Sequence, residues 1–552
     1  MRAAPPDPAR LLELTLALCR IRSVSGRAGE ENACADYIAA TLKAVSASHG
    51  NVLEVATFDC ENDSLGRKAV FALLTPPAAA PRTVLLTGHF DVVDAAVCGE
   101  LEALAFDPQA YTRALGGKDI DEDARRDLED GGWLFGRGTM DMKAGIALQI
   151  AAIETLAACP DLKLNVAFLA VPDEEADSAG MRGSLAGLVA KLQAKGLKLN
   201  AALTGEPCFW TRETEGRPAA RPYYTGTTGK IMPLFYVLGR EAHVGCYFEG
   251  MNAALVASRI VEIVEADPEA IDTEGSDTLP PAACLKLETR TGAYSVTLPD
   301  RAAAYFNMLH VRSTPGDVLA YCLRAARRAA DDALRQIRTG AAAVTDRGGL
   351  APFAEEIAVT TVSQVRDAAR AAFANRESFE EAFGDWYAKA CAKADAREAA
   401  VRSLEWMIEK AGLTGPAVIV GFVPPYYPPR LNRGETEDER RLALAVRSAC
   451  EKGGALAGDG RTVMTEVFAG ITDLSFLGFE AGREALEALS ANLPAWGRAY
   501  DLPVEALLKL DVPVANMGPA GKDAHKATER LELGYSFRVA PALLLETLEN
   551  LA

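Results

Sequence analysis

The chain has 552 residues, with 58 Lys and Arg against 76 Asp and Glu, and 49% of its residues are hydrophobic. One hydrophobic core does not support this length, so we expect two or three domains. The net charge of −18 comes from acids that alternate with basic residues. This balance argues against nucleic acid and anionic membrane as partners.

The eleven cysteines are scattered singly and form no CxxC pair. This spacing favours free thiols in a reducing compartment, and we therefore expect a cytoplasmic protein. The first apolar run, at residues 11–19, contains a glutamate and is followed by no small-residue cleavage site. We interpret it as an amphipathic helix and not as a signal peptide. No segment has the roughly 18 uninterrupted apolar residues of a membrane span.

Up to about residue 210, amphipathic helices alternate with short apolar runs at residues 83–87, 164–171 and 201–204. This order predicts an α/β domain whose sheet is covered on both faces. Residues 211–222 are rich in Arg, Glu, Pro and Gly. We expect them to form a linker.

The next part of the chain has a different order of elements, which predicts a small α/β sandwich inserted into the first domain. Its expected strands and helices are, in order, a strand at 231–238, a helix at 253–266, strands at 285–298 and 302–311, a helix at about 315–339, and a closing strand at 417–423. Between the last two, residues 343–413 are rich in Ala, Glu, Arg and Lys without a β-like run. We predict a helical insertion there.

Residues 424–429 contain four prolines and are the second predicted linker. From about residue 435 the mixed α/β pattern resumes and is expected to complete the first domain. The predicted fold class is α/β. A mixed-sheet domain of residues 1–215 and 430–552 would carry an inserted α+β sandwich of residues 216–429, which includes the helical insertion.

His89 is one of only five histidines, and it follows the apolar run 83–87 in the sequence Gly-His-Phe-Asp. A strand that ends in this way places an imidazole at the carboxyl edge of a sheet. Asp91 would supply the outer partner that fixes the tautomer of a metal-binding histidine. A single His-x-Asp is more often a structural pair, so this motif needs support from others.

Acidic residues occupy three further positions of the same kind. Asp141 lies in a glycine-rich turn at residues 136–145, which opens a helix but lacks the spacing of a phosphate loop. Residues 173–175 are three consecutive acids after an apolar run, and Glu206 follows the next run. Packed carboxylates repel one another unless a cation or protons intervene. Each cluster alone has an ordinary interpretation as a solvated loop or turn.

A second histidine, His525, ends a glycine-rich segment at residues 518–525. Two histidines and three or four carboxylates therefore occur at strand ends or in glycine-rich loops, where open α/β sheets bind their ligands. This donor set suits Zn, Mn or Co in a two-metal hydrolytic site.

In their order along the chain, these motifs resemble the M20 metallopeptidase and deacylase family, which includes acetylornithine deacetylase, succinyl-diaminopimelate desuccinylase and glutamate carboxypeptidases. The family motif Gly-His-x-Asp-x-Val corresponds to residues 88–93, and Gly-Arg-Gly-x-x-Asp-Met-Lys-x-Gly to residues 136–145. The acidic cluster, Gly-Glu-Pro at residues 205–207 and the late Gly-Pro…His complete the set. The resemblance covers nearly the whole chain, with Ala144 in place of the usual glycine.

The resemblance implies a zinc-peptidase-like catalytic domain that binds two divalent metal ions, zinc by preference and cobalt or manganese as alternatives. Asp141 would bridge the two ions. His89 and Glu206 would complete one site, and Glu175 and His525 the other.

The resemblance also implies roles outside the ligand set. Asp91 would orient His89. Glu174 would be the general base, which takes a proton from the attacking water and passes it to the leaving amine. Residues 470–473 resemble a turn near the site, and Glu529 would hydrogen-bond His525.

The inserted segment would be the family's lid and dimerisation domain. His243, in the sequence at residues 239–245, would polarise the scissile carbonyl, either within one chain or across a homodimer. A helix cap or packing role is the alternative for this residue. Asn252 and Arg312 would grip the carboxylate of a small-molecule substrate, although ordinary structural roles are as common for such residues.

The implied protein is a two-metal-dependent amidohydrolase that cleaves an N-acyl amino acid or a small peptide-like amide. The long chain and its insertion resemble the RocB-like arginine-utilisation subgroup, which would place the reaction in arginine or amino-acid catabolism. Two alternatives stay open. One is a dipeptidase or carboxypeptidase of the same family, and the other is a metal-stabilised scaffold that has lost catalysis.

Overall fold

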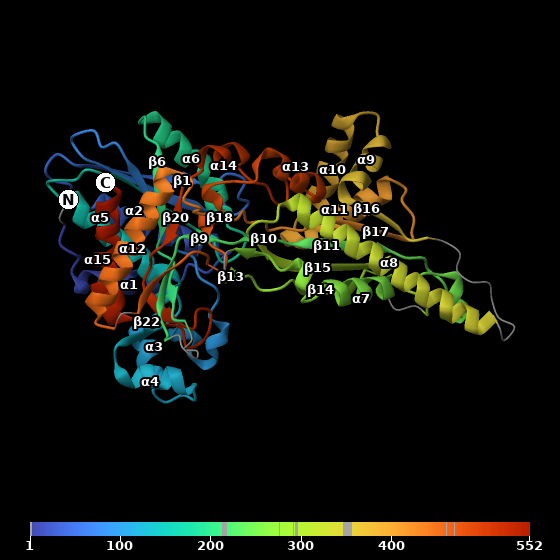
Figure 1. Cartoon of the computed structure of the whole chain (residues 1–552), viewed down its shortest axis with the longest axis horizontal. Coiled ribbons are helices and arrows are strands. Elements are labelled where there is room, and N and C mark those ends of the chain that lie inside the picture. Colours follow the sequence, from blue (N-terminus) through green and yellow to red (C-terminus); the bar gives the residue numbers. More distant parts are fainter. Residues whose placement is uncertain are drawn as a thin grey trace. The chain divides into compact units, whose positions relative to one another are not determined.

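The computed structural model describes residues 3–211, 218–274, 277–290, 292, 296–345, 356–459, 461–468 and 470–552. The chain forms two compact units (Figure 1). Unit 1 contains Met1–Thr227, Arg430–Phe479 and Pro503–Ala552. Unit 2 contains Thr228–Pro429 and Glu480–Leu502.

The main sheet of unit 1 has eight strands. In spatial order they are β1 (Val52–Asp59), β2 (Lys68–Thr75), β5 (Asn165–Val171), β3 (Thr83–His89), β6 (Leu199–Thr204), β20 (Val514–Asn516), β8 (Arg221–Tyr224) and β19 (Thr462–Thr465). The four central strands β5, β3, β6 and β20 run parallel. Their carboxyl ends therefore share one edge of the sheet.

Helices cover both faces of this sheet because successive strand side chains point to opposite sides. Val84 and Leu86 of β3 belong to one core with side chains from α1 (Pro8–Arg20), α2 (Ala28–Lys43), α5 (Ala144–Ala157), α12 (Glu437–Ala457) and α15 (Ala540–Leu551). On the other face, Gly187 of α6 (Ala179–Ala194) lies against Phe58, which stacks on Phe71. Helix α14 (Val504–Leu510) packs on α6.

A second sheet of unit 1 joins segments that are far apart in the sequence. Its order is β4 (Trp133–Phe135), β22 (Arg530–Glu532), β21 (Ala520–Lys522) and β7 (Cys208–Phe209). Phe135 pairs with Arg530, so the loop that follows β4 lies beside the loop between β21 and β22. Helices α3 (Pro108–Leu115) and α4 (Glu122–Asp130) precede β4.

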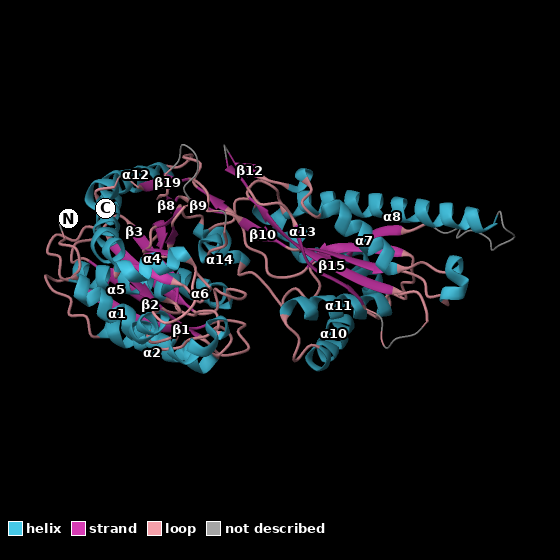
Figure 2. Cartoon of the chain, turned by 90° about the horizontal axis from the view of Figure 1, so that it is seen from below, coloured by secondary structure: helices cyan, strands magenta, loops and turns pink. Residues whose placement is uncertain are grey.

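Unit 2 is a sheet between two layers of helices (Figure 2). The strand order is β10 (Gly229–Ile231), β15 (Arg301–His310), β11 (Pro233–Leu238), β17 (Ala417–Phe422) and β16 (Ala358–Thr361), and β14 (Ala283–Thr289) pairs with β15. Helices α7 (Ala253–Val264) and α8 (Pro315–Thr345) cover one face. On the other face, Leu234, Tyr236 and Ile419 share a core with α9 (Val362–Ala371), α10 (Arg376–Ala390) and α11 (Ala396–Lys410).

Short pairs complete the architecture: β9 (Gly226–Thr227) with β18 (Arg430–Leu431), and β12 (Thr273–Glu274) with β13 (Asp277–Thr278). The α/β fold class with an inserted α+β domain is confirmed. The expected insertion at 343–413 is not wholly helical, however. Three β-branched residues in Ala358–Thr361 form β16, which hydrogen-bonds to β17. Residues 346–355 of the insertion lie outside the described residues.

Two expected boundaries also differ. The predicted linker 211–222, of which 212–217 are not described, ends inside strand β8. Pro222 fits there because β8 is paired on both sides only at Tyr224. Residues 480–502 were expected in the catalytic domain, but α13 (Gly482–Asn492) packs against α8, α9 and β17 of unit 2.

Among the described helices, none combines the length and apolar character that crossing a membrane requires. All eleven cysteines lie in the described part of the chain, and none is in a disulfide.

Candidate dinuclear metal site

Four of the predicted site residues lie at the carboxyl ends of adjacent parallel strands. His89 is the last residue of β3, and its backbone pairs with Val171 at the end of β5. Glu174 and Glu175 follow β5, and Glu206 follows β6. Because β5, β3 and β6 are neighbours, their polar ends converge at one edge of the sheet.

Asp141 and His525 reach the same place from the second sheet. Asp141 lies in a short irregular segment, Thr139–Lys143, between β4 and α5. His525 lies between β21 and β22 with a φ of 67°, in the left-handed region that non-glycine residues seldom adopt. The pairing of β22 with β4 brings these two loops together.

The side chains form two groups that could each hold a metal ion. The first is His89, Asp141 and Glu206, and the second is Asp141, Glu175 and His525, with ligand atoms within 4.8 Å in each group. Asp141 belongs to both. Its Oδ1 lies 3.3 Å from Nε2 of His89, and its Oδ2 lies 3.3 Å from Nε2 of His525. Each carboxylate oxygen therefore faces a different histidine, as a bridging ligand requires.

Asp91 organises the site in a way that the sequence did not show. The Nδ1 of His89 lies 3.0 Å from the backbone oxygen of Asp91, which leaves Nε2 directed toward Asp141 and Glu206. The Asp91 carboxylate accepts hydrogen bonds from the backbone N–H groups of Glu174 and Glu175, at 3.1 and 3.2 Å. Asp91 thus holds His89 chiefly through its main chain and the two glutamates through its side chain.

The charge of this cluster favours a cation. Burial, together with the charge of the neighbouring Asp141, raises the pKa of Glu175 to about 7. Burial also raises the pKa values of Glu174 and Glu206. Two histidines do not neutralise four packed carboxyl groups, whereas divalent cations would. The nitrogen and carboxylate donors suit zinc, cobalt or manganese.

Glu174 belongs to neither ligand group in the described part of the chain. Its Oε2 lies 3.9 Å from Nε2 of His89, so it faces the cluster without completing it. Asp473, in the turn at residues 470–473, is also buried near the site. Its pKa is raised to about 7, mainly by burial, and the charges of His89 and Glu206 contribute to its titration.

The three consecutive acids do not act together. Asp173 turns away from the cluster into a buried ion pair with Arg67, which also contacts Asp63 and Glu31. The second Asp173 oxygen accepts from the N–H of Ala179 at the start of α6. Sequence reasoning missed Arg67 because it lies about 106 residues before its partner, outside every motif.

Arg137 and Glu529 form another buried ion pair, with Nη1 and Oε2 2.6 Å apart and both side chains 1% exposed. Arg137 also donates to the backbone oxygen of His525 at 3.1 Å, and Glu529 accepts from the N–H of Met140 at 3.4 Å. The pair therefore ties the Asp141 loop to the His525 loop. Glu529 was expected to hydrogen-bond the His525 ring, but its partner is Arg137.

We expect Glu529→Gln to weaken metal binding in the group that contains His525 by roughly 10- to 100-fold, as loss of an outer-shell partner does. The free energy of unfolding should fall by about 3–5 kcal/mol, because Arg137 would stay buried without its counter-charge. Chelator competition and urea unfolding measure the two effects. Glu532→Gln, which removes the ion pair between Glu532 of β22 and Arg221 of β8, should lower stability but spare metal affinity. Equal metal loss in both variants would contradict the positioning role.

Three predicted substrate residues lie in unit 2. His243 is exposed and caps the short helical segment Val244–Glu249, where its Nδ1 accepts from the N–H of Gly245 at 3.1 Å. The proton of a neutral ring is then on Nε2, which remains a donor. Asn252 caps α7 by accepting from Ala254 N–H at 2.9 Å. The backbone N–H of Arg312 donates to Asp272 at 2.9 Å.

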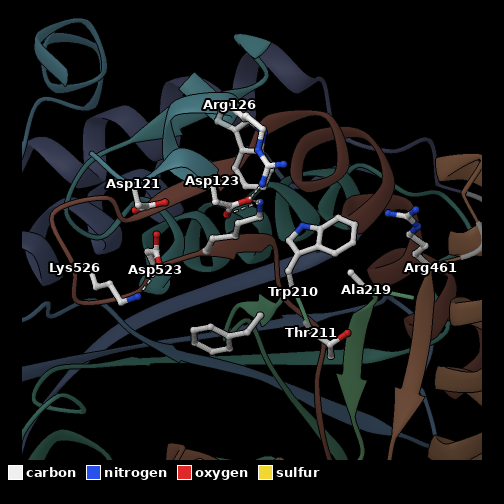
Figure 3. Close-up of a pocket in the computed structure, with 13 residues that line it drawn as sticks. Asp121, Asp123, Arg126, Trp210, Thr211, Ala219, Arg461, Asp523 and Lys526 are labelled. Carbon is white, nitrogen blue, oxygen red and sulfur yellow. Dashed lines mark hydrogen bonds and ion pairs between the residues drawn. The ribbon is translucent and has the colours of Figure 1, made fainter. Parts of the chain in front are cut away.

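A cavity of about 960 Å³ also lies in unit 1 (Figure 3). Asp523 and Lys526, on either side of His525, line it together with Asp123 and Trp210. None of the proposed metal ligands lines it, and several of its charged groups pair with one another, as Lys526 does with Asp523 at 2.8 Å. We assign the chemistry to the ligand cluster and not to this cavity.

A mixed α/β unit with two groups of carboxylates and histidines at the carboxyl edge of its sheet is typical of metal-dependent hydrolases. The family model for Peptidase family M20/M25/M40 matches residues 85–486. The chain belongs to this peptidase family and is a hydrolase, which confirms the resemblance found in the motifs.

Two relatives match nearly the whole chain. The chain is 31% identical to the Bacillus subtilis protein YqjN over 98% of this chain and 96% of the relative. It is 28% identical to protein RocB of the same organism over 99% and 95%. Succinyl-diaminopimelate desuccinylase 2 of Shewanella loihica is 30% identical, over 44% of this chain and 56% of that enzyme.

Two solved structures share the fold. A tripeptidase from Staphylococcus aureus aligns with a TM-score of 0.51 at 13% identity, over 99% of both chains. The aminopeptidase PepT from Bacillus cereus aligns with a TM-score of 0.50 at 14% identity, also over 99% of both. At these identities the likeness concerns the fold alone.

Proposed function

We propose that this hydrolase is a two-metal amidohydrolase that cleaves an N-acyl amino acid or a small peptide-like amide. The observation that carries the proposal is the position of Asp141, whose two oxygens each lie 3.3 Å from a different histidine. His89 and Glu206 would hold one ion, and Glu175 and His525 the other. Two bound cations would lower the pKa of water and polarise the amide carbonyl.

In this proposal Glu174 moves the proton. Its carboxylate is buried beside His89 yet outside both ligand groups, so it is available as a base. It would accept a proton from the water that attacks the amide carbonyl and deliver it to the nitrogen of the leaving amine. Asp91 would support this transfer because it holds the backbone N–H of Glu174.

His243, Asn252 and Arg312 are proposed to recognise the substrate. The Nε2–H of His243 would donate to the carbonyl oxygen on which negative charge develops, in its own chain or across a dimer. Asn252 uses its side-chain oxygen as a helix cap, which leaves its N–H groups for a substrate carboxylate. Arg312 would pair with the same carboxylate.

The similarity to a succinyl-diaminopimelate desuccinylase supports an N-acyl amino acid as the substrate class. We place the reaction in arginine or amino-acid catabolism, as the subgroup resemblance implies. Eleven unpaired cysteines support a cytoplasmic setting. A homodimer through unit 2 is expected, and light scattering after gel filtration measures it.

The proposal is tested with the full chain, reconstituted separately with zinc, cobalt and manganese. The substrate panel contains N-acetyl amino acids, N-succinyl amino acids, dipeptides and longer peptides. Mass spectrometry identifies the products. We expect about two metal ions per chain and hydrolysis of N-acyl amino acids in preference to dipeptides. His243→Ala should lower kcat about 10²- to 10³-fold, as removal of an oxyanion donor does, with metal content unchanged.

Other results would redirect the assignment. Turnover of dipeptides alone, or release of a C-terminal residue from longer peptides, would identify a dipeptidase or a carboxypeptidase. Two bound ions without turnover of any panel member would support the scaffold. Fewer than about two ions after reconstitution would overturn the two-metal site.

A further inference from the structure

A cavity of about 310 Å³ lies in unit 2, between α9, α10 and α11 on one side and the end of α13 with the chain that follows it on the other. These helices are labelled in Figure 1. The cavity belongs wholly to the helical insertion and to the segment 480–502. Its volume is at the lower end of the range typical of small-molecule sites.

The charges that line this cavity are unbalanced. Arg366, Arg370 and Arg376 contribute three guanidinium groups, and Glu380 is the only acidic residue in the lining. Glu380 accepts a hydrogen bond from Arg370 at 3.1 Å. Arg370 also lies 3.8 Å from Asp367, which is outside the lining. Two carboxylates therefore face three cations, and Arg366 and Arg370 are like charges one helical turn apart on α9, an arrangement that costs stability.

Arg366 has no carboxylate within ion-pair distance in the described part of the chain. It donates to the backbone oxygens of Ser490 and Leu493, at 3.2 and 2.7 Å, and so anchors the end of α13. Burial, together with the charge of Arg370, lowers the pKa of Arg366 to about 10. These carbonyl bonds explain why Arg366 lies here, but they do not neutralise its charge.

Most of the rest of the wall is apolar. Phe379, Phe383, Trp496 and Met407 line the same cavity. Phe379 also lies under the Arg370 guanidinium, 5.4 Å from ring centroid to Cζ. A ligand with a flat apolar body and an oxygen-rich anionic group would fit this lining. Its body would contact the aromatic side chains, and its anionic group would bind the guanidinium groups, which hold carboxylate and phosphate in a planar, two-pronged geometry.

We propose that this cavity is an accessory binding site for a small oxyanion, a carboxylate or phosphate carried on a flat apolar body, separate from the metal centre. Arg370 and Arg376 bind the anionic group, Arg366 supplies further positive charge, and the aromatic side chains hold the body. The site goes beyond the proposed hydrolase function and does not depend on it.

Isothermal titration of the metal-loaded full chain tests the site, at constant ionic strength, with benzoate and inorganic phosphate as probes and benzamide as the neutral analogue of benzoate. We expect saturable benzoate binding and no benzamide binding. The double variant Arg370→Gln/Arg376→Gln should bind at least about tenfold more weakly, because it removes charge-assisted hydrogen bonds. Arg335→Gln, which removes an exposed α8 arginine that pairs with Asp332, is the matched control and should bind normally.

Glu380→Gln gives the sharpest test, because it should strengthen binding. The substitution removes the nearer of the two carboxylates that pair with Arg370, the one inside the cavity, whereas a purely structural role for the arginines predicts no gain. Saturable binding of phosphate alone, lost in the double variant, would also support the site and assign a bare oxyanion. Any of four results would overturn the site: benzamide binds as tightly as benzoate, Arg335→Gln loses as much affinity as the double variant, Glu380→Gln shows no gain in affinity, or neither anion binds. Because the readout is binding, failure here leaves the hydrolase assignment untouched.

Discussion

Glu174→Gln is expected to lower kcat by about 10²- to 10⁴-fold while the protein keeps its metal ions, because a general base contributes an effect of this size. The amide has nearly the shape of the carboxylate but cannot accept the proton of the attacking water. Glu174 lies outside both ligand groups, so metal content should not change. Steady-state kinetics on the preferred N-acyl amino acid, together with metal analysis of the same samples, measure both quantities.

Two variants serve as controls for this experiment. Glu174→Asp keeps the charge but shortens the side chain by one methylene group, and its loss of kcat should be smaller than that of the glutamine variant. Glu129→Gln, on the exposed side of α4, should match the unmodified enzyme. If Glu174→Gln retains normal kcat at full metal occupancy, Glu174 is not the base.

Asp141→Ala is expected to weaken both metal ions at once, by more than the roughly 100-fold that loss of an outer-shell partner can cost. Asp141 is the only residue shared by the two groups in the described part of the chain. His525→Ala should instead weaken one ion selectively, because His525 belongs to a single group. Chelator competition, with metal analysis after dialysis, distinguishes the loss of two ions from the loss of one.

Asp473→Asn is the matched control for the metal measurement. Asp473 is a buried acid whose titration is influenced by His89 and Glu206, yet it belongs to neither ligand group. The variant should therefore retain both ions. If Asp141→Ala and His525→Ala lose the same number of ions, Asp141 does not bridge two separate sites.

Much of the catalytic unit could be predicted from the order of residues alone. A buried strand requires an apolar run, and the first polar residue after it marks the edge of the sheet. This is why His89 at the end of β3 and Glu206 just after β6 could be recognised before their neighbours in space were known. The same reasoning located Asp141 in a turn before a helix.

Unit 2 was harder to predict from the sequence. Strand β16 has four residues, too few for a clear period, and its identity depends on hydrogen bonds to β17. The segment 480–502 has the composition of any amphipathic helix, and only its packing against α8 and α9 assigns it to unit 2. The arginine-lined cavity likewise exists only where α9, α10 and this segment meet.

By itself, then, the sequence determined which residues stand at strand ends and in glycine-rich turns, because hydrophobic periodicity is a local property. The tertiary structure decided which of them meet. Strand order places β5 beside β3 and β6, and the pairing of β22 with β4 joins the loops of Asp141 and His525. The tertiary structure also turns the Asp173 side chain away from the cluster that Glu174 faces, because Asp173 pairs with Arg67. Contacts between residues hundreds of positions apart leave no local pattern, and only the folded chain reveals them.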